Sequence, residues 1–354
     1  MSNSALAAAP ASPDPRIHMS GQGFEIEQRY SVGKTSDHRS YSWFALPVAY
    51  SLSNKYNGFR FSGRGLETPP EWRVSPMLRS NDKDKIVELY DVISPYYPSL
   101  WGEHLHHGYW IVGDESKEKA QLQLVEHLAQ LANLKPGSDI LDIGCGIGAS
   151  SLYLAKNYNA TVTGITVSQV QVEMATTAAA RERLDVKFLL MDAEAMDFNK
   201  QFDVLWSVES ISHYPHRENF FASANGLLKP GGAFAIIDWF KKQNLTRAET
   251  KKFIHPIEKG MLCELQTMDD YEHYLTSKGL QIMHREVLNR NCAKTWDLGL
   301  DIIKNRSFWA LASKYGSNIV SHLKAFRAMR AGFASGNFVY GLFVARAPSN
   351  PFTK

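Results

Sequence analysis

The residues best placed to do chemistry lie in one short stretch, SDILDIGCGIGASSLYLAK, between Ser138 and Lys156. Its apolar residues from Ile140 to Ile143 are typical of a strand buried on both faces, and an amphipathic helical pattern ends the stretch. The turn between them contains Gly144, Gly146 and Gly148. A strand, a glycine turn and a helix N-terminus together bring backbone N–H groups against a nucleotide-like ligand. The stretch therefore predicts a nucleotide or nucleoside site.

The charge beside these glycines distinguishes between two ligands. The spacing of Gly144, Gly146 and Ala149 also satisfies the dinucleotide fingerprint, which requires an acidic residue at the end of the second strand. That strand, expected over 160–166, ends at Thr166 with no carboxylate. Asp142 instead precedes the glycines, where it would repel a pyrophosphate but attract a ligand with an ammonium and a sulfonium group. We therefore expect S-adenosylmethionine (SAM) rather than NAD.

Three further positions suit the rest of such a nucleoside. Gln171, in the first turn after the second strand, is able to bond ribose hydroxyls, and the alternative is a surface glutamine. Asp192 and Ala193 follow the third strand, where a carboxylate beside a backbone N–H complements adenine. Cys145 lies inside the glycine turn and is interpreted as a small packed residue rather than a catalytic thiol.

The end of the fourth strand, expected over 204–208, carries the candidate catalytic groups. Parallel α/β sheets bind ligands beyond the carboxyl ends of their strands, and Glu209, Ser210 and His213 follow this one. His213 is the first candidate for a general base, with Glu209 orienting it or stabilising a cation after methyl transfer to an alkene. The alternatives are that His213 packs at a helix start, or that His106 or His107 is the base.

Aromatic and histidine residues crowd the segment SPYYPSLWGEHLHHGYW, residues 94–110. Ring faces attract sulfonium as they attract ammonium, so the segment suits a lid over a cation and an apolar substrate. Tyr97, Trp110 and, at the end of the fifth strand, Trp239 are the predicted substrate contacts. Packing alone is the alternative for each ring. His106 and His107 point to opposite sides of an extended segment, so we expect no metal site.

Strand and helix patterns alternate along the chain and predict its architecture. Seven strands with intervening helices are expected to form one α/β domain over 81–354. Its last two strands form a hairpin with a long connection, and helical insertions lie at 241–270 and 289–335. Residues 1–80 form an extension, irregular at first and aromatic-rich from about residue 41.

Composition limits the partners and the location of the protein. A net charge of +3 is too small to indicate nucleic-acid binding, and no apolar run is long enough to span a membrane. Three distant cysteines suit a reducing compartment. No signal-peptide pattern occurs, so we expect a cytoplasmic location, with organellar targeting left open and a homo-oligomer allowed.

The ordered motifs resemble those of class I SAM-dependent methyltransferases, from about Tyr90 to Pro348. LDIGCGIG is similar to their glycine loop, and ITVSQVQ, which contains Thr166, is similar to their ribose segment with Gln171. MDAEAMDF is similar to the adenine segment, and WSVESISH and LLKPGG to two later motifs. Within this class, the sequence is most similar to the small-molecule branch of tocopherol, sterol and cyclopropane-fatty-acid methyltransferases. The resemblance implies a Rossmann-like seven-stranded sheet, mostly parallel with a terminal antiparallel hairpin, and a cap over an apolar acceptor. It also implies that Tyr90 and Tyr109, in the segment YDVISPYYPSLWGEHLHHGYW, cover SAM.

The sequence thus predicts a methyltransferase for an apolar small molecule, a terpenoid, prenylated or aromatic acceptor, with transfer to carbon. The first alternative is N- or O-methylation of an alkaloid or phenolic natural product on the same scaffold. The second, from another class, is a nicotinamide oxidoreductase or a non-catalytic SAM-binding protein. The departure from the family pattern before residue 80 and in 289–335 leaves the acceptor open.

Overall fold

The computed structural model describes residues 81–316 and 318–349. All of them belong to the compact unit Thr68–Lys354, which is distinct from the unit Met1–Glu67. The expectations for residues 1–80 therefore lie outside the described residues.

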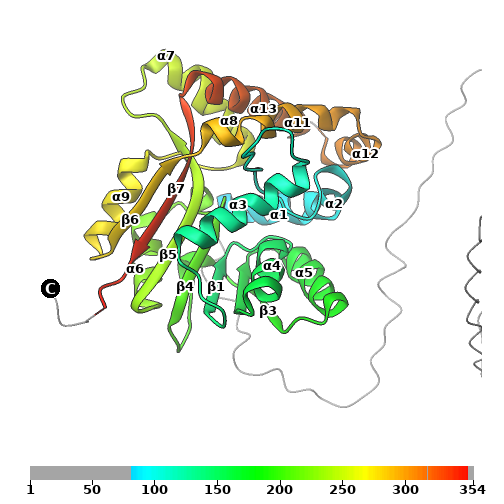
Figure 1. Ribbon diagram of the computed structural model, residues 1–354. Helices are drawn as coiled ribbons and strands as arrows, with labels where there is room; N and C mark the ends of the chain where they lie inside the picture. Colours follow the sequence, from blue (N-terminus) through cyan, green and yellow to red (C-terminus); the bar gives the residue numbers. More distant parts are fainter. Residues whose placement is uncertain (1–80, 317, 350–354) are drawn as a thin grey trace, which may run out of the picture. The chain divides into compact units, whose positions relative to one another are not determined.

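A seven-stranded sheet forms the centre of this unit (Figure 1). Its strands are β1 (Asp139–Ile143), β2 (Thr161–Thr166), β3 (Val186–Leu190), β4 (Phe202–Val208), β5 (Leu228–Lys241), β6 (Gln281–Val287) and β7 (Phe338–Arg346). The order is β3-β2-β1-β4-β5-β7-β6, and β7 runs antiparallel to both β5 and β6 while the other pairs are parallel. The predicted sheet, mostly parallel with an antiparallel end, is confirmed.

The order of the strands reverses between β1 and β4, because the chain moves from β1 outward to β3 and then returns to β4. Ligands of open α/β sheets bind at such a switch point, beyond the carboxyl ends of the strands. The fold itself therefore places a site beside the turn that follows β1.

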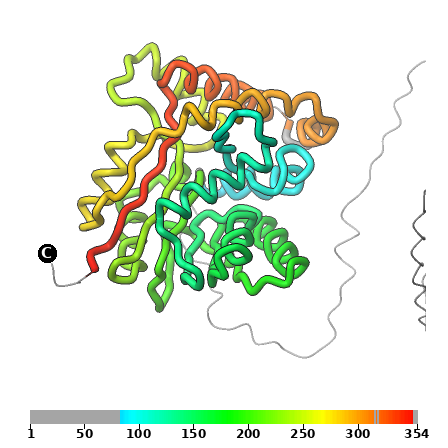
Figure 2. Tube along the Cα trace, viewed as in Figure 1, coloured from blue at the N-terminus to red at the C-terminus, as the bar shows by residue number. Residues whose placement is uncertain are grey.

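Helices flank the sheet and continue beyond its carboxyl edge (Figures 1 and 2). They are α1 (Asn81–Ile93), α2 (Tyr97–Leu100), α3 (Lys117–Leu131), α4 (Ala149–Tyr158), α5 (Gln169–Glu182), α6 (Arg217–Gly226), α7 (Arg247–Glu249), α8 (His255–Met261), α9 (Met268–Ser277), α10 (Asn289–Cys292), α11 (Lys294–Asp301), α12 (Arg306–Tyr315) and α13 (Asn318–Ser335). Short turns of 3-10 helix are η2 (Ser94–Tyr96), η3 (Ala193–Ala195), η4 (Ile211–His213) and η6 (Ile302–Lys304), and η5 (Thr250–Ile254) is a π-helical turn.

Alternation along the strands divides the core between the two faces of the sheet. In β1, Ile140 packs into one apolar cluster with α3 and α13, whereas Leu141 and Ile143 pack into another with α6 and α9. Successive side chains of a strand point to opposite faces, so both clusters follow from one short sequence. The cluster on the first face continues to Trp239, Trp296 and Phe333 beneath the cap helices.

The segments predicted as cap insertions are mainly helical. Residues 241–270 contain α7, η5 and α8, and residues 289–335 contain α10 to α13. Helix α13 packs on α8, α11 and β7, and α12 contacts α2, far earlier in the chain (Figure 2). Within the described residues, no helix is both long enough and apolar enough to cross a bilayer.

Candidate functional site

A large cavity lies at the carboxyl ends of the first five strands, under α1, the segment 101–107 and the cap helices. Its empty volume is about 1430 Å³, the part open to solvent included, which is large enough for a nucleoside cofactor together with an apolar acceptor. The predicted site residues that line it are Tyr90, Tyr97, His107, Asp142, Gly144, Cys145, Gly146, Thr166, Gln171, Ala193, Glu209, His213 and Trp239.

The glycine turn after β1 forms the floor. Gly144, Gly146 and Gly148 all have positive φ, and a Cβ on Gly144 would lie only 2.4 Å from the Cβ of Ser210. The N–H groups of Gly144 and Cys145 donate to the carbonyl of Ile165 at 2.9 and 3.0 Å, which holds the turn against β2. Glycine is therefore required here by backbone conformation and by close approach.

Asp142 lines this floor as a buried carboxylate, 3% exposed. Burial raises the pKa of the Asp142 carboxyl to about 7, a shift that the hydrogen bond from Ser151 opposes. The Ser151 hydroxyl donates to Asp142 Oδ2 at 2.6 Å. A ligand with positive charge beside this carboxylate would favour its ionised form.

Gln171 is a buried residue, 3% exposed, so the alternative of a surface glutamine is excluded. Thr166 Oγ1 donates to its Oε1 at 2.6 Å, and its Nε2 donates to Ser94 Oγ at 3.1 Å. Ser168, the N-cap of α5, accepts from the Gln171 backbone and donates to Asp91 Oδ1 at 2.5 Å. The ribose segment is thereby tied to α1 and η2.

Asp192 does not line the cavity, although its neighbours Met191 and Ala193 do. Its carboxylate accepts from the backbone N–H of Glu194 at 2.9 Å and from Lys83 Nζ at 2.6 Å. Lys83 also lies 2.5 Å from Glu194 Oε2. Burial alone would lower the pKa of the Lys83 ammonium, but the two carboxylates raise it. The N-terminal turn of α1 is thus ion-paired to the segment that follows β3.

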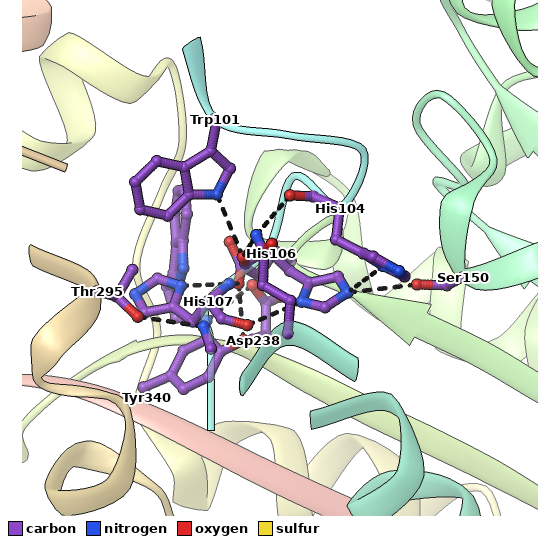
Figure 3. Close-up of polar contacts among 12 residues, drawn as sticks. Trp101, His104, His106, His107, Ser150, Asp238, Thr295 and Tyr340 are labelled. Carbon is purple, nitrogen blue, oxygen red and sulfur yellow. Dashed lines mark hydrogen bonds and ion pairs between the residues drawn. The ribbon is translucent and has the colours of Figure 1, made fainter. Parts of the chain in front are cut away.

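Glu209 binds His107 rather than His213. His107 donates to Glu209 Oε1 from its backbone N–H at 2.8 Å and from Nδ1 at 2.7 Å, and Tyr340 donates from its hydroxyl at 2.7 Å (Figure 3). Burial would raise the pKa of the Glu209 carboxyl, but the His107 and Tyr340 contacts lower it, so the group is ionised. Glu209 holds this position in the left-handed region, at φ +54°.

The tautomer of His107 follows from this contact. Because an ionised carboxylate only accepts hydrogen bonds, Nδ1 of His107 carries the proton. Its Nε2 is buried without a hydrogen-bond partner in the described part of the chain. The ring stacks on Tyr340, with centroids 4.2 Å apart, and meets Trp296 edge-on at 4.8 Å.

His213 is oriented by a backbone carbonyl and a tyrosine. Its Nδ1 lies 3.1 Å from the carbonyl oxygen of Leu262, which accepts but does not donate, so Nδ1 is the donor. Nε2 therefore accepts from the Tyr90 hydroxyl at 2.9 Å. Burial lowers the pKa of His213 and raises the pKa of Tyr90, which keeps both groups neutral. Glu209 does not hydrogen-bond to His213, contrary to the predicted orienting role, because η4 turns the imidazole toward α1 and Leu262.

Trp239 lies between the two histidines and presents an edge-to-face contact to each. The ring centroids are 6.4 Å from His107 and 6.2 Å from His213. Trp239, Tyr97, Trp296 and the two histidines form an aromatic wall of the cavity, and the Glu209 carboxylate binds His107 in this wall. The ionised Glu209 carboxylate therefore lies in surroundings made mainly of aromatic rings.

The histidine cluster before His107 is satisfied within the protein (Figure 3). Nδ1 of His104 lies 3.1 Å from Nε2 of His106, and Nδ1 of His106 lies 2.9 Å from the carbonyl oxygen of His107. Burial lowers the pKa of His104 to about 3 and also lowers that of His106. In the part of the chain that the structure describes, no group of three or more His, Cys, Asp and Glu side chains is placed to hold a metal ion.

Tyr109 and Trp110 do not line the cavity. The ring of Tyr109 stacks on His127 of α3, with centroids 4.7 Å apart, and its N–H donates to Ala120. Trp110 Nε1 donates to the carbonyl of Glu115 at 2.9 Å. Gly108 lets the chain approach α3 closely, since a Cβ there would be 2.8 Å from the Cβ of Ala120. We therefore propose neither a cofactor contact for Tyr109 nor a substrate contact for Trp110.

Cys145 lines the cavity as a packed thiol, consistent with its interpretation from the sequence. Its Sγ donates to the carbonyl of Gly146 at 3.7 Å, and burial raises its pKa well above the usual value. A thiol held in the protonated form is a poor nucleophile.

Several lining residues were not predicted individually. They come from the segment before His107 and from the cap, namely Trp101, Leu105, Met261, Trp296, Ile302 and Phe326. Their one signal in the sequence is helical spacing of apolar residues, which does not distinguish a cavity wall from ordinary packing.

The residues on the floor fit SAM. The buried Asp142 carboxylate complements an ammonium group, the glycine turn leaves room that a Cβ would fill, and Thr166 and Gln171 offer polar atoms at the end of β2. No acidic residue follows β2 to bind the ribose of a dinucleotide.

Comparison with known proteins agrees with this geometry. The family model described as mycolic acid cyclopropane synthetase matches residues 78–336. The 27-O-demethylrifamycin SV methyltransferase of Amycolatopsis mediterranei is 30% identical over 75% of this chain and 97% of its own length. The probable chloroplastic tocopherol O-methyltransferase of Oryza sativa is 30% identical over 75% of this chain and 78% of its own.

Solved structures share the fold. The crystal structure of mycolic acid cyclopropane synthase CmaA1, complexed with SAH and CTAB, superposes with a TM-score of 0.67 at 20% identity, covering 74% of this chain and 97% of that one.

Proposed function

The chain belongs to the mycolic acid cyclopropane synthetase family and is a SAM-dependent methyltransferase, and from that membership we propose that it methylates carbon of an apolar terpenoid, prenylated or aromatic acceptor. The observation that carries this proposal is the aromatic wall of the cavity with one ionised carboxylate, Glu209, bound to His107 in it. Such a wall admits an apolar molecule and places negative charge where a carbon nucleophile becomes cationic.

When bound, SAM would supply an electrophilic methyl group and a good leaving group, a neutral thioether. The protein must then align the acceptor and exclude water, and alignment alone is worth about 7–11 kcal/mol. The cap helices and α1 perform this exclusion, and Trp239, Tyr97 and Trp296 position the acceptor.

Two groups manage the charge and the proton on the acceptor. Glu209, fixed by His107 and Tyr340, stabilises positive charge that develops on the methylated carbon. The carbon then loses a proton to the Tyr90 oxygen while the Tyr90 hydroxyl proton passes to His213 Nε2. His213, neutral beforehand because burial lowers its pKa, becomes an imidazolium and keeps its Nδ1 bond to Leu262. General-base catalysis of this kind contributes ~10²–10⁴-fold in rate.

O-methylation of a phenol is the second candidate, with N-methylation of an amine as a variant. The Tyr90–His213 pair favours it, because the same relay would accept the proton of a phenolic hydroxyl. Both relatives described above bear names that specify O-methyl chemistry.

The test uses one acceptor that offers both atoms. The purified protein is incubated with SAM carrying a trideuterated methyl group and a prenylated hydroquinone, and the product is analysed by mass spectrometry and NMR. A new ring-carbon methyl supports the proposal, and a methoxy signal supports the second candidate. Methylation of a polar amine, with no product from any apolar acceptor, would refute both the apolar acceptor and the carbon target.

A further inference from the structure

The cap segment 289–335 has an unusual charge. It contains eight lysines and arginines against two aspartates and no glutamate, a net charge of +6, whereas the whole chain has +3. The rest of the chain is therefore acidic on balance. Positive charge is concentrated on the helices that cover the cavity.

Much of this charge is exposed and not neutralised. Lys304 pairs with Asp301, and Arg330 pairs with Asp297. Among residues 81–316 and 318–349, no carboxylate forms an ion pair with the exposed Arg306, Lys324 or Arg327. These three cations are free to interact with a negatively charged surface.

Large apolar side chains are exposed on the same helices, α12 and α13, and on the η6 turn before them. Trp309 is 62% exposed, Val320 is 50% exposed and Ile303 is 40% exposed. Trp309 Nε1 donates to the carbonyl of Ile303 at 3.0 Å, so the two lie together. Helix α12 buries Phe308 and Leu311, and Leu311 packs against Leu89 and Ile93 of α1, which orients the exposed face of α12.

Two residues that line the cavity have exposed neighbours in this segment. Ile302 lines the cavity, and the next residue, Ile303, points to solvent. In α13, Phe326 lines the cavity while its neighbour Arg327 is exposed.

We propose that this docking face, formed by Ile303, Arg306, Trp309, Val320, Lys324 and Arg327, binds the surface of an anionic lipid bilayer. The inference rests on the proposed function, because an apolar acceptor partitions into a bilayer. Tryptophan and aliphatic side chains insert at the headgroup level, and arginine and lysine bind anionic lipids. Two copies of the chain joined through this face would instead bring positive charges together.

Vesicle sedimentation tests the inference without SAM or acceptor, so the result is independent of the proposed reaction. The full chain is mixed with phosphatidylcholine vesicles, with or without one-third phosphatidylglycerol. We expect binding to the anionic vesicles only, and loss of that binding in 0.5 M NaCl. Arg306→Gln should weaken the partition coefficient roughly fivefold, and Trp309→Ser roughly tenfold.

Matched controls use exposed residues elsewhere. Val112→Ser removes an apolar side chain that is 81% exposed, and Lys119→Gln removes an exposed charge on α3. Both should bind like the unchanged protein. Equal binding to both vesicle types, no binding, or equal effects of Trp309→Ser and Val112→Ser would overturn the inference. A dimer that Trp309→Ser dissociates in light scattering would also overturn it and assign the face to a second copy.

Discussion

Tyr90 on α1 donates its hydroxyl proton to Nε2 of His213, 2.9 Å away, across 123 residues of sequence. The bond joins the helix that covers the cavity to the turn that follows β4. It also fixes which atom of the imidazole is able to receive a proton.

We expect Tyr90→Phe to lower kcat by about 10²-fold, because it removes the relay between acceptor and His213. SAM affinity, measured by calorimetry, should change little. His213→Ala should likewise lower kcat far more than SAM affinity, and the double variant should be no slower than either single one. Additive losses would mean that the two residues act separately, and unchanged turnover would remove His213 from the mechanism.

Glu209→Gln keeps the shape of the side chain but removes its charge. We expect a lower kcat on a carbon acceptor, and a loss of about 1–3 kcal/mol in the free energy of unfolding, because His107 and Tyr340 then donate to a neutral group. The pKa of Glu209 is lowered, so its contribution to stability is complete above the usual glutamate pKa and is lost as pH falls through the folded-state value. Urea unfolding between pH 3 and 7 measures this, with Glu103→Gln, an exposed glutamate, as control.

We expect the affinity for SAM to rise with pH, because the Asp142 carboxyl must ionise to bind a cation. The pKa of its carboxyl is raised to about 7, so the protein without ligand loses stability as pH rises from the usual aspartate value toward 7. A cationic ligand prefers the ionised form, so SAM affinity should rise by up to about tenfold per pH unit below 7.

Titration calorimetry between pH 5.5 and 7.5 checks this trend. Asp142→Asn should bind SAM more weakly and with a flat pH profile. An unchanged profile would show that the Asp142 carboxylate does not face the cationic part of the cofactor.

Asp238 holds the turn η4, which carries His213, in position through hydrogen bonds. Its Oδ2 accepts from the backbone N–H of Ser212 at 2.8 Å and from the Tyr271 hydroxyl at 2.9 Å. Arg217 Nη2 donates to the Ser212 carbonyl at 2.8 Å. Asp238→Ala leaves the Ser212 N–H and the Tyr271 hydroxyl without their acceptor and should cost about 1–3 kcal/mol of unfolding free energy for each.

Tyr271→Phe removes one donor only and should cost about 1 kcal/mol. A comparison of the two variants by chemical denaturation, with kcat and KM of each, separates positioning from stability. Positioning predicts that Asp238→Ala lowers kcat at temperatures where it remains folded, and equal kcat in the two variants would contradict that role.

The sequence predicted the floor of the cavity better than its walls. Gly144, Gln171 and Ala193 lie where expected because each follows a strand directly, and the carboxyl ends of parallel strands meet at one edge. The partner of Glu209 was not predicted correctly, since His107 lies 102 residues earlier and only tertiary packing brings it there. Tyr109 was expected over the cofactor, but its stacking on His127 depends on how α3 packs.

The contacts of α1 have a consequence for the timing of catalysis. Three side chains hold this helix in place. Lys83 pairs with Asp192 after β3, Asp91 accepts from Ser168 at the N-cap of α5, and Tyr90 donates to His213. Any motion of α1 wide enough to admit the nucleoside also withdraws the Tyr90 hydroxyl from the imidazole. In the proposed mechanism, the proton relay from Tyr90 to His213 is therefore complete only while α1 lies against the cavity.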